Sequence, residues 1–197
     1  MFKKILLFFG ITKKKPKFDL EKSFEDYKNR KIYPRLTIDI INNYDKNDLD
    51  SLVLDSLNLR LKDINNPSKE FEIVNTWSKG QQAVFSTFEL DSEVLNGGFN
   101  QFYFNSSKIY YKLAENGLKL LGSKKYLELM INANSIYLKY TDHFENFDVS
   151  TAEGFIESYI DSPLGDLDDI FYDLDEIKSI KEFRCEYILK NISEFTD

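Results

Sequence analysis

The stretch Glu93–Asn105, EVLNGGFNQFYFN, places two adjacent glycines between a helical pattern and a run of aromatic residues. Asparagine and glycine accept the backbone conformations that end a helix, and a Gly-Gly pair lets two helices approach closely at a sharp bend. Three aromatic side chains that can fill a core follow the glycines, at Phe99, Phe102 and Phe104. We interpret Asn96, Gly97 and Gly98 as a structural joint, and we predict a left-handed conformation at one of the glycines.

The residues before the joint predict a central helix over Gln81–Leu95, because apolar residues occupy two of its faces. One face carries Ala83, Thr87, Leu90 and Val94, and a second carries Val84, Phe88 and Leu95. The remaining strip carries Gln82, Ser86, Glu89 and Glu93. A helix that is apolar on two sides packs against other helices on both flanks, so we expect only the polar strip to reach water.

The amides Asn100 and Gln101 are less easily explained by packing, since a side-chain amide is costly to bury unless it forms hydrogen bonds. We favour a structural role, and a ligand-binding surface remains the alternative. Further on, Asn105, Ser106 and Ser107 supply N-cap candidates for a helix starting near Lys108. A phosphate-binding loop is not indicated, because no strand precedes the glycines and no GxGxxG or Walker spacing is present.

Elsewhere the apolar residues mostly recur every three or four positions, as in Tyr126, Leu129, Met130, Ala133 and Tyr137. Breaks fall at Asn65–Ser68 and at Ser162–Gly165, each around a proline. Leu36, Ile38 and Ile40 alternate as in a strand, but an isolated strand would have no partner. We therefore predict an all-α fold, a single-domain irregular helical bundle over residues 19–197, preceded by a basic and apolar segment over residues 1–18.

Composition supports one packed domain. The 197 residues suffice for one well-buried core, and 17 Phe and 12 Tyr are more aromatic residues than a disordered chain would carry. Four Pro and eight Gly argue against a loop-rich all-β protein. A single cysteine cannot form an internal disulfide, so nothing in the sequence requires an oxidising compartment.

Charge is distributed unevenly along the chain. Residues 1–35 contain 11 Lys and Arg against 4 Asp and Glu, whereas residues 141–197 contain 4 against 16. The acidic C-terminal third is unsuited to direct contact with nucleic acid and suited to a basic protein partner.

The N-terminal segment, MFKKILLFFGITKKKPK, has an apolar run, Ile5–Phe9, that is too short to span a bilayer. We interpret the segment as a short helix or tail that lies against the domain, and we predict a cytoplasmic protein. Two alternatives remain open: a weak peripheral contact with an anionic membrane, and a cleaved signal peptide.

Few residues suit catalysis or metal binding. The only histidine, His143, lacks the partners of a metal site, and Cys185 is expected to be a small buried hydrophobe. Glu89 and Glu93 lie one helical turn apart and could serve acid–base chemistry, but no histidine or second carboxylate helix accompanies them. We predict no catalytic residue, no metal and no cofactor, and we predict that the protein is not an enzyme.

The segment ELDSEVLNGGFNQFYFNSS, Glu89–Ser107, resembles the signature of a bacterial family that was once a domain of unknown function and is now named for a DNA-mimic protein. The matching positions are Glu93, Val94, Asn96, Gly97, Gly98, Phe99, Gln101, Phe102, Asn105 and Ser106. The resemblance implies an all-α fold without known enzymatic activity. For the named member it also implies a homodimer whose acidic surface imitates DNA toward a DNA-binding protein.

The acidic stretch GDLDDIFYDLDEI predicts a helix with two unlike faces. Asp166, Asp169, Asp173 and Glu176 share one face, and Leu167, Ile170, Phe171 and Leu174 share the other. An ordinary solvated face is one interpretation. The other is a partner-binding surface, formed by these four residues together with Glu89.

Two classes of function follow. The first is a non-catalytic interaction protein whose acidic face binds a basic or DNA-binding protein, and an immunity-type protein that blocks a toxin belongs to the same class. The second is an enzyme of unfamiliar type that uses the carboxylates and amides between Glu89 and Gln101. The first class is favoured, because the chain lacks the usual nucleophiles and bases.

Overall fold

The computed structural model describes residues 25, 28–142, 146–147, 151–160 and 162–196. The chain divides into two compact units, Met1–Lys31 and Ile32–Asp197, and the second contains almost all of the described residues. Segment 1–18 and His143 lie outside the described residues, so the expectations for both remain predictions.

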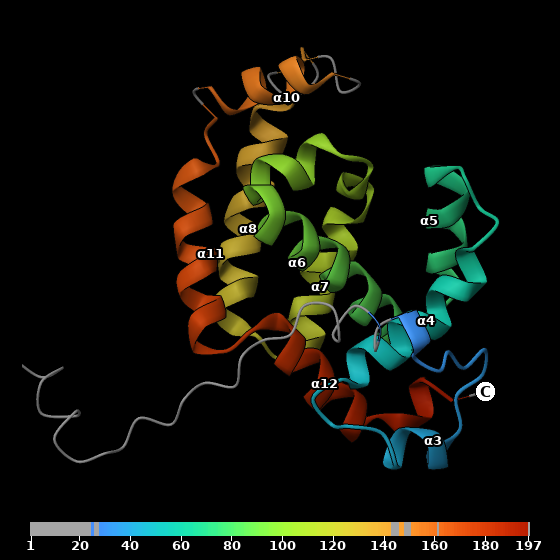
Figure 1. Cartoon of the computed structure of the whole chain (residues 1–197). Helices are drawn as coiled ribbons and strands as arrows, with labels where there is room; N and C mark the ends of the chain where they lie inside the picture. The colour runs from blue at the N-terminus through green and yellow to red at the C-terminus, as the bar shows by residue number, and fades with distance from the viewer. Residues whose placement is uncertain (1–24, 26–27, 143–145, 148–150, 161, 197) are drawn as a thin grey trace, which may run out of the picture. The chain divides into compact units, whose positions relative to one another are not determined.

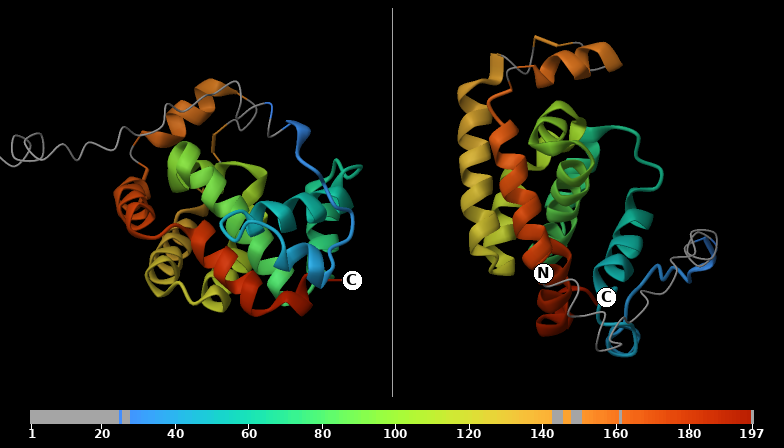
Figure 2. Two further views of the ribbon diagram at one scale, coloured as in Figure 1. Left: turned by 60° about the horizontal axis from the view of Figure 1, so that its bottom comes forward. Right: turned by 60° about the vertical axis from the view of Figure 1, so that its left-hand side comes forward.

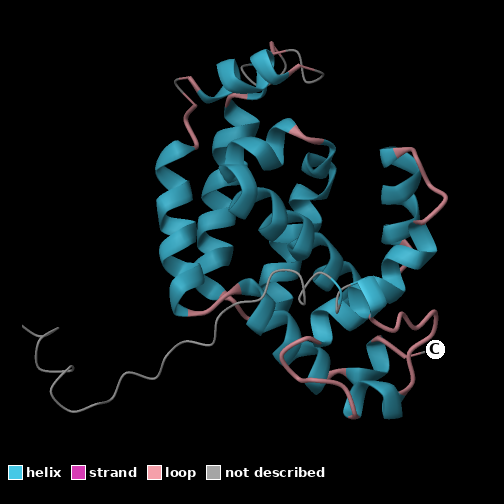
Figure 3. Ribbon diagram, in the orientation of Figure 1, coloured by secondary structure: helices cyan, strands magenta, loops and turns pink. Residues whose placement is uncertain are grey.

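All regular structure in these ranges is helical (Figure 3), which confirms the predicted all-α class. The elements are α3 (Ile38–Asn42), α4 (Leu49–Leu61), α5 (Pro67–Asn75), α6 (Lys79–Phe104), η1 (Ser106–Tyr110), α7 (Tyr111–Leu121), α8 (Lys124–Lys139), α10 (Ala152–Tyr159), α11 (Gly165–Ile177), α12 (Ile180–Lys190) and η2 (Ile192–Glu194), of which η1 and η2 are 3₁₀-helices.

Local signals explain the starts of α3 and of α5, and α5 begins at the predicted break Asn65–Ser68. The Thr37 hydroxyl accepts a hydrogen bond from the backbone N–H of Ile40 at 3.3 Å. Thr37 thereby caps α3, which begins at Ile38. The alternation at Leu36, Ile38 and Ile40 therefore belongs to a helix start and not to a strand. Asn66 caps α5 in the same way, and Pro67 occupies the first helical position, where its missing N–H costs nothing.

Helix α6 is the central element, with α4 and α12 on one flank and α7 and α11 on another (Figure 1). Both of its apolar faces are packed, as predicted, and they enter two separate cores: Ala83, Leu90 and Val94 belong to one, and Val84 belongs to the other, with Phe88 packed against it.

Two expectations for α6 were wrong. Leu95, which the pattern places on an apolar face, is 47% exposed. The polar strip does not reach water along its whole length, since Gln82 and Ser86 are buried. The Gln82 amide is nevertheless satisfied, because its Nε2 donates to the carbonyl oxygens of Asn75 and Trp77 at 3.0 and 2.9 Å.

The first core joins α6 to α7, α8 and α11, and α8 and α11 lie side by side (Figure 2). The rings of Tyr126 on α8 and Phe171 on α11 meet edge to face, with centroids 5.2 Å apart. On α7, Gly117 permits close packing, since a Cβ there would stand 2.9 Å from Thr87 Cγ2 and 3.1 Å from Ala83 Cα. Helix α11 therefore packs on a core that it shares with α6, α7 and α8.

The start of α6 is capped twice. Ser78 and Gln81 form a capping box, in which each side chain bonds the other residue's backbone N–H. Glu194, which follows far along the chain, accepts a hydrogen bond from the Gly80 N–H at 2.6 Å and from the Tyr187 hydroxyl at 2.6 Å. The first turn of the central helix is therefore completed by the C-terminal region.

Among the described helices, none combines the length and the apolar character that crossing a bilayer requires.

Candidate functional site

The joint interrupts α6 at two residues with non-helical backbone. Gly97 has φ −161° and ψ 35°, and Gly98 has φ 71° and ψ 179°. The Gly98 conformation is open in practice only to glycine, whereas the φ of Gly97 is extended and available to any residue. The bend and the positive φ are confirmed, although the ψ of Gly98 differs from that of an ordinary helix-ending glycine.

Helix α11 holds both sides of this bend. The second half of α6 starts at Phe99, whose backbone N–H has no partner within the helix and donates to Asp168 Oδ1 at 2.8 Å. One turn further along α11, the Tyr172 hydroxyl donates to the carbonyl oxygen of Val94 at 3.1 Å. Burial raises the pKa of Asp168, and the bond from Phe99 opposes that rise. The sequence does not single out Asp168 or Tyr172, since they lie far from the joint along the chain.

Glu93 organises the polar residues of the signature. Its Oε2 accepts hydrogen bonds from Gln101 Nε2 at 2.6 Å and from Asn105 Nδ2 at 2.9 Å, and its Oε1 accepts one from Ser107 Oγ at 2.7 Å. The three donors come from beyond the bend, so Glu93 ties the two halves of α6 together.

The predicted N-cap role of this segment is wrong. A 3₁₀-helix, Ser106–Tyr110, precedes α7, and no side chain caps it. Asn105 Nδ2 and Ser107 Oγ instead donate hydrogen bonds to the Glu93 carboxylate.

Asn100 is buried, and both polar atoms of its amide form hydrogen bonds within the protein. Its Nδ2 donates to Ser158 Oγ at 2.7 Å, and its Oδ1 accepts from Ser162 Oγ at 3.1 Å. The amides of Asn100 and Gln101 thus join the halves of α6 to each other and to the region of α10, which supports the structural interpretation of the joint. Asn96 is exposed at the outer side of the bend.

The outer face of α11 carries the four predicted carboxylates. Asp166, Asp169, Asp173 and Glu176 are all exposed, and Leu167 and Phe171 on the opposite face are buried. Ile170, which the sequence pattern places on the buried face, is 48% exposed. The acidic face is therefore bordered by an apolar side chain that the prediction assigned to the core.

Glu89 does not lie on α11. It occupies α6 and is partly buried, with the carboxylates of Glu70 and Glu93 nearby. Burial first, and then repulsion from Glu70 and Glu93, raises the pKa of Glu89 to about 7. The Tyr110 hydroxyl donates to Glu70 Oε1 at 2.6 Å. The five predicted partner-binding residues are thus divided between the face of α11 and a half-buried cluster on α6.

Replacing Glu89 with glutamine is expected to stabilise the fold by about 1–3 kcal/mol above pH 7. The folded-state pKa of Glu89 is about 7 against an ordinary 4.5, so ionisation costs free energy in the folded chain only. The gain should shrink as the pH falls from 7 to 4.5 and disappear below 4.5, where both states carry a protonated carboxyl.

Urea unfolding of both proteins at about pH 8 and about pH 4 measures this difference. Glu128→Gln, at an exposed position on α8, is the control and should change stability little at either pH. No gain at the higher pH would mean that water solvates the Glu89 carboxylate.

A buried ion triad, which the sequence analysis does not anticipate, joins α12 to α4 and α6. The guanidinium of Arg184 donates to Asp50 Oδ2 at 3.1 Å, to Asp91 Oδ2 at 3.0 Å and to the Thr87 carbonyl at 3.2 Å. All three charged residues are buried. Next to them, Cys185 is buried as predicted, and burial raises the pKa of its thiol, which disfavours the reactive thiolate.

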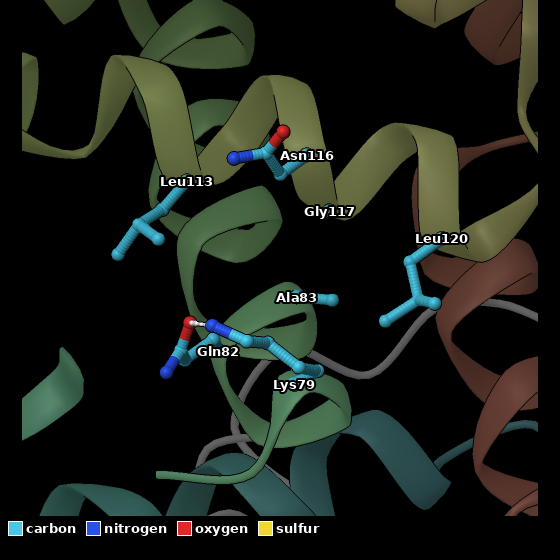
Figure 4. Close-up of a pocket in the computed structure, with 7 residues that line it drawn as sticks. All are labelled: Lys79, Gln82, Ala83, Leu113, Asn116, Gly117 and Leu120. Carbon is cyan, nitrogen blue, oxygen red and sulfur yellow. Dashed lines mark hydrogen bonds between the residues drawn. The ribbon is translucent and has the colours of Figure 1, made fainter. Parts of the chain in front are cut away.

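The hollow between α6 and α7 offers no catalytic set (Figure 4). It has a volume of about 210 Å³ and is lined by Lys79, Gln82, Ala83, Leu113, Asn116, Gly117 and Leu120. Lys79 Nζ donates to Gln82 Oε1 at 3.3 Å, and the lining contains no carboxylate, thiol or imidazole. Within the part of the chain that the structure describes, no three His, Cys, Asp or Glu side chains are arranged to hold a metal ion.

Comparison with known proteins gives one family match. The model of the family described as DMP19-like protein matches residues 75–191, from the end of α5 to just beyond α12. Neither the search of curated proteins nor the search of solved structures found a match. The matched region contains the joint, the Glu93 network and α11, and it covers more than half of the chain. The chain therefore belongs to the DMP19-like protein family.

Proposed function

We propose that this chain is a non-catalytic interaction protein that binds a basic partner protein through the acidic face of α11, as a DNA mimic binds a DNA-binding protein. One observation carries the proposal. The inner face of α11 holds the bend of α6 through Asp168 and Tyr172, while its outer face presents Asp166, Asp169, Asp173 and Glu176 to solvent. The carboxylates are consequently presented on a fixed helix and not on a loop.

The spacing of these charges supports mimicry of a DNA strand. Along a helix that rises about 1.5 Å per residue, the four carboxylates follow one another every 4.5 to 6 Å, roughly. Phosphates along one strand of duplex DNA are spaced about 3.4 Å along the axis. The helix is less densely charged than DNA but has the same sign, so a surface that binds phosphates would also be attracted to it.

Family membership supports the same function, since the family is one of DNA-mimic proteins and is not a known enzyme family. Of the two glutamates that could have served an enzyme near the joint, Glu93 is engaged within the protein, where it accepts hydrogen bonds from Gln101, Asn105 and Ser107. An immunity-type protein that blocks a toxin would use the same acidic face, and the identity of the partner distinguishes the two.

Affinity capture followed by binding measurements tests the proposal. The wild type is compared with a variant in which Asp166, Asp169 and Asp173 become Asn and Glu176 becomes Gln. We expect a captured basic protein to bind the variant at least about tenfold more weakly, and to bind the wild type more weakly as salt rises, because the attraction is between exposed charges. Duplex DNA should compete for the same partner if that partner binds DNA.

A matched variant controls for net charge. Asp39, Asp63 and Asp142 become Asn and Glu128 becomes Gln, so the same number of exposed charges is removed from other elements. Both variants should fold, because exposed like charges contribute little to stability. If the partner binds the wild type, the α11 variant and the control variant equally, and if its affinity does not depend on salt concentration, the α11 face is not the binding surface.

A further inference from the structure

The outer face of α11 is not purely acidic. Ile170 and Ile177 are 48% and 75% exposed, although both are large apolar side chains. They are seven residues apart, so they project from nearly the same side of the helix, about 10.5 Å from each other. Asp166 and Asp173 are also seven residues apart. Because each residue turns the helix by about 100°, the two isoleucines lie along one edge of the strip that these two aspartates occupy.

A single exposed isoleucine is common on protein surfaces and needs no explanation. Here two of them align with each other and with a row of carboxylates, and Tyr172, 38% exposed, lies at the other edge of that row. A surface that interacts only through charge gains nothing from this arrangement. A surface that places apolar side chains beside a charged row gains from both, since protein interfaces combine buried apolar side chains with polar ones.

We propose that the segment that binds α11 is an amphipathic helix of a partner protein, with an apolar stripe bordered by lysine and arginine. This inference rests on the proposed function and names the shape and chemistry of the partner. The seven-residue spacing of Ile170 and Ile177 matches the repeat by which two packed helices place apolar side chains against each other. The carboxylates beside that stripe pair with the basic border of the partner, which sets its orientation.

The position of α11 allows such docking. Its inner face is occupied by the core through Leu167 and Phe171, so only the outer face can receive a partner. The nearest cation in the sequence, Lys178, is engaged by Glu186 and does not neutralise the acidic row. A helix lying along α11 would therefore meet apolar and acidic groups over about two turns.

Two synthetic peptides test the proposal. The first consists of leucine and lysine, with leucine at i, i+3, i+4 and i+7 and lysine on the flanks. The second has the same composition in scrambled order, so that its net charge is unchanged but no apolar stripe forms. Fluorescence anisotropy with the full chain should show the amphipathic peptide binding about tenfold more tightly than the scrambled one.

Two pairs of substitutions locate the effect. Ile170→Ser with Ile177→Ser should abolish the preference for the amphipathic peptide and leave the weaker, charge-driven binding of the scrambled peptide unchanged. Ile131→Ser with Leu138→Ser is the matched control, because these side chains are 49% and 53% exposed and also seven residues apart, on α8. This control should retain the preference.

The outcomes separate the inference from the proposed function. Equal binding of the two peptides to the wild type, or an undiminished preference in the Ile170 and Ile177 variant, overturns the amphipathic-helix partner. If the variant lacking the four α11 carboxylates still binds both peptides more weakly than the wild type, the acidic face remains a binding surface. If that variant binds both peptides as well as the wild type does, the α11 face is not the surface that binds them, and both proposals are wrong. If neither peptide binds the wild type, the amphipathic-helix partner is wrong, and the captured partner alone tests the proposed function.

Discussion

Replacing Gly98 with valine is expected to destabilise the fold by about 3 kcal/mol or more. Two costs add at this position. The backbone has φ 71° and ψ 179°, which a residue with a Cβ avoids. A Cβ would also overlap the Asp168 carboxylate, standing 2.6 Å from its Cγ, so the bond from the Phe99 N–H would be lost or displaced. Thermal or urea unfolding of the wild type and the variant measures this loss of stability.

Two other glycines separate the two costs. Gly122 has φ 77° with open space around a Cβ, so Gly122→Ala should cost only the backbone strain, about 1 kcal/mol. Gly165, at the start of α11, has open space and no positive φ, so Gly165→Ala should change stability little. If Gly98→Val is as stable as Gly165→Ala, the joint is not the rigid element described above.

Replacing Arg184 with methionine is expected to destabilise the fold by about 3–5 kcal/mol, because it removes the cation that hydrogen-bonds two buried carboxylates. Asp50 and Asp91 each bind the guanidinium at about 3 Å, and both are buried. Lys181→Met, on the same helix, is the control. Its ammonium pairs with the exposed Asp48 at 2.7 Å and lies 4.0 Å from Asp50 Oδ1, farther than the guanidinium does, so its loss should cost only about 1 kcal/mol.

The loss of stability in the Arg184→Met variant should depend on pH. Burial already raises the pKa of Asp91, and Arg184 opposes that rise, so removing Arg184 raises this pKa further. A carboxyl whose folded-state pKa exceeds its unfolded value destabilises the fold when ionised, and the variant should therefore recover stability as the pH falls toward about 4.

A triple variant, Asp50→Leu, Arg184→Met and Asp91→Leu, should recover most of the lost stability at neutral pH. Urea unfolding at two pH values decides the matter. A loss of stability that does not depend on pH and persists in the triple variant would instead indicate lost packing around the aliphatic part of the Arg184 side chain.

The sequence predicts local structure well in this protein and long-range polar partners poorly. The bend at Gly97 and Gly98 is readable, because the conformational preferences of glycine act at the residue itself. The exposed carboxylates of α11 could also be predicted, because their spacing places them on one helix face. Ile170 was misplaced because a 3.6-residue period gives the direction of the buried face but not its width, and the width depends on which helices pack beside it.

The contacts that define the site come from residues distant in the chain. Asp168 is 69 residues from Phe99, and Arg184 is 134 residues from Asp50. No local pattern marks an aspartate as the cap of another helix, since the same residue type is common on solvated faces. The Glu93 network was partly anticipated as a motif, but that Asn105 and Ser107 donate to Glu93 and do not cap a helix N-terminus depends on the three-dimensional path of the bend.

The bond between Glu194 and the Gly80 N–H bears on synthesis by the ribosome. The two residues are separated by 114 positions, so at about 5 to 20 residues per second the start of α6 waits roughly 6 to 23 s for its carboxylate partner. During that interval the nascent α6 has two apolar faces and lacks α11 and α12, which cover part of them. Helices α11 and α12, which are translated after α6, therefore complete its packing, and the nascent chain depends until then on whatever shields its apolar surface.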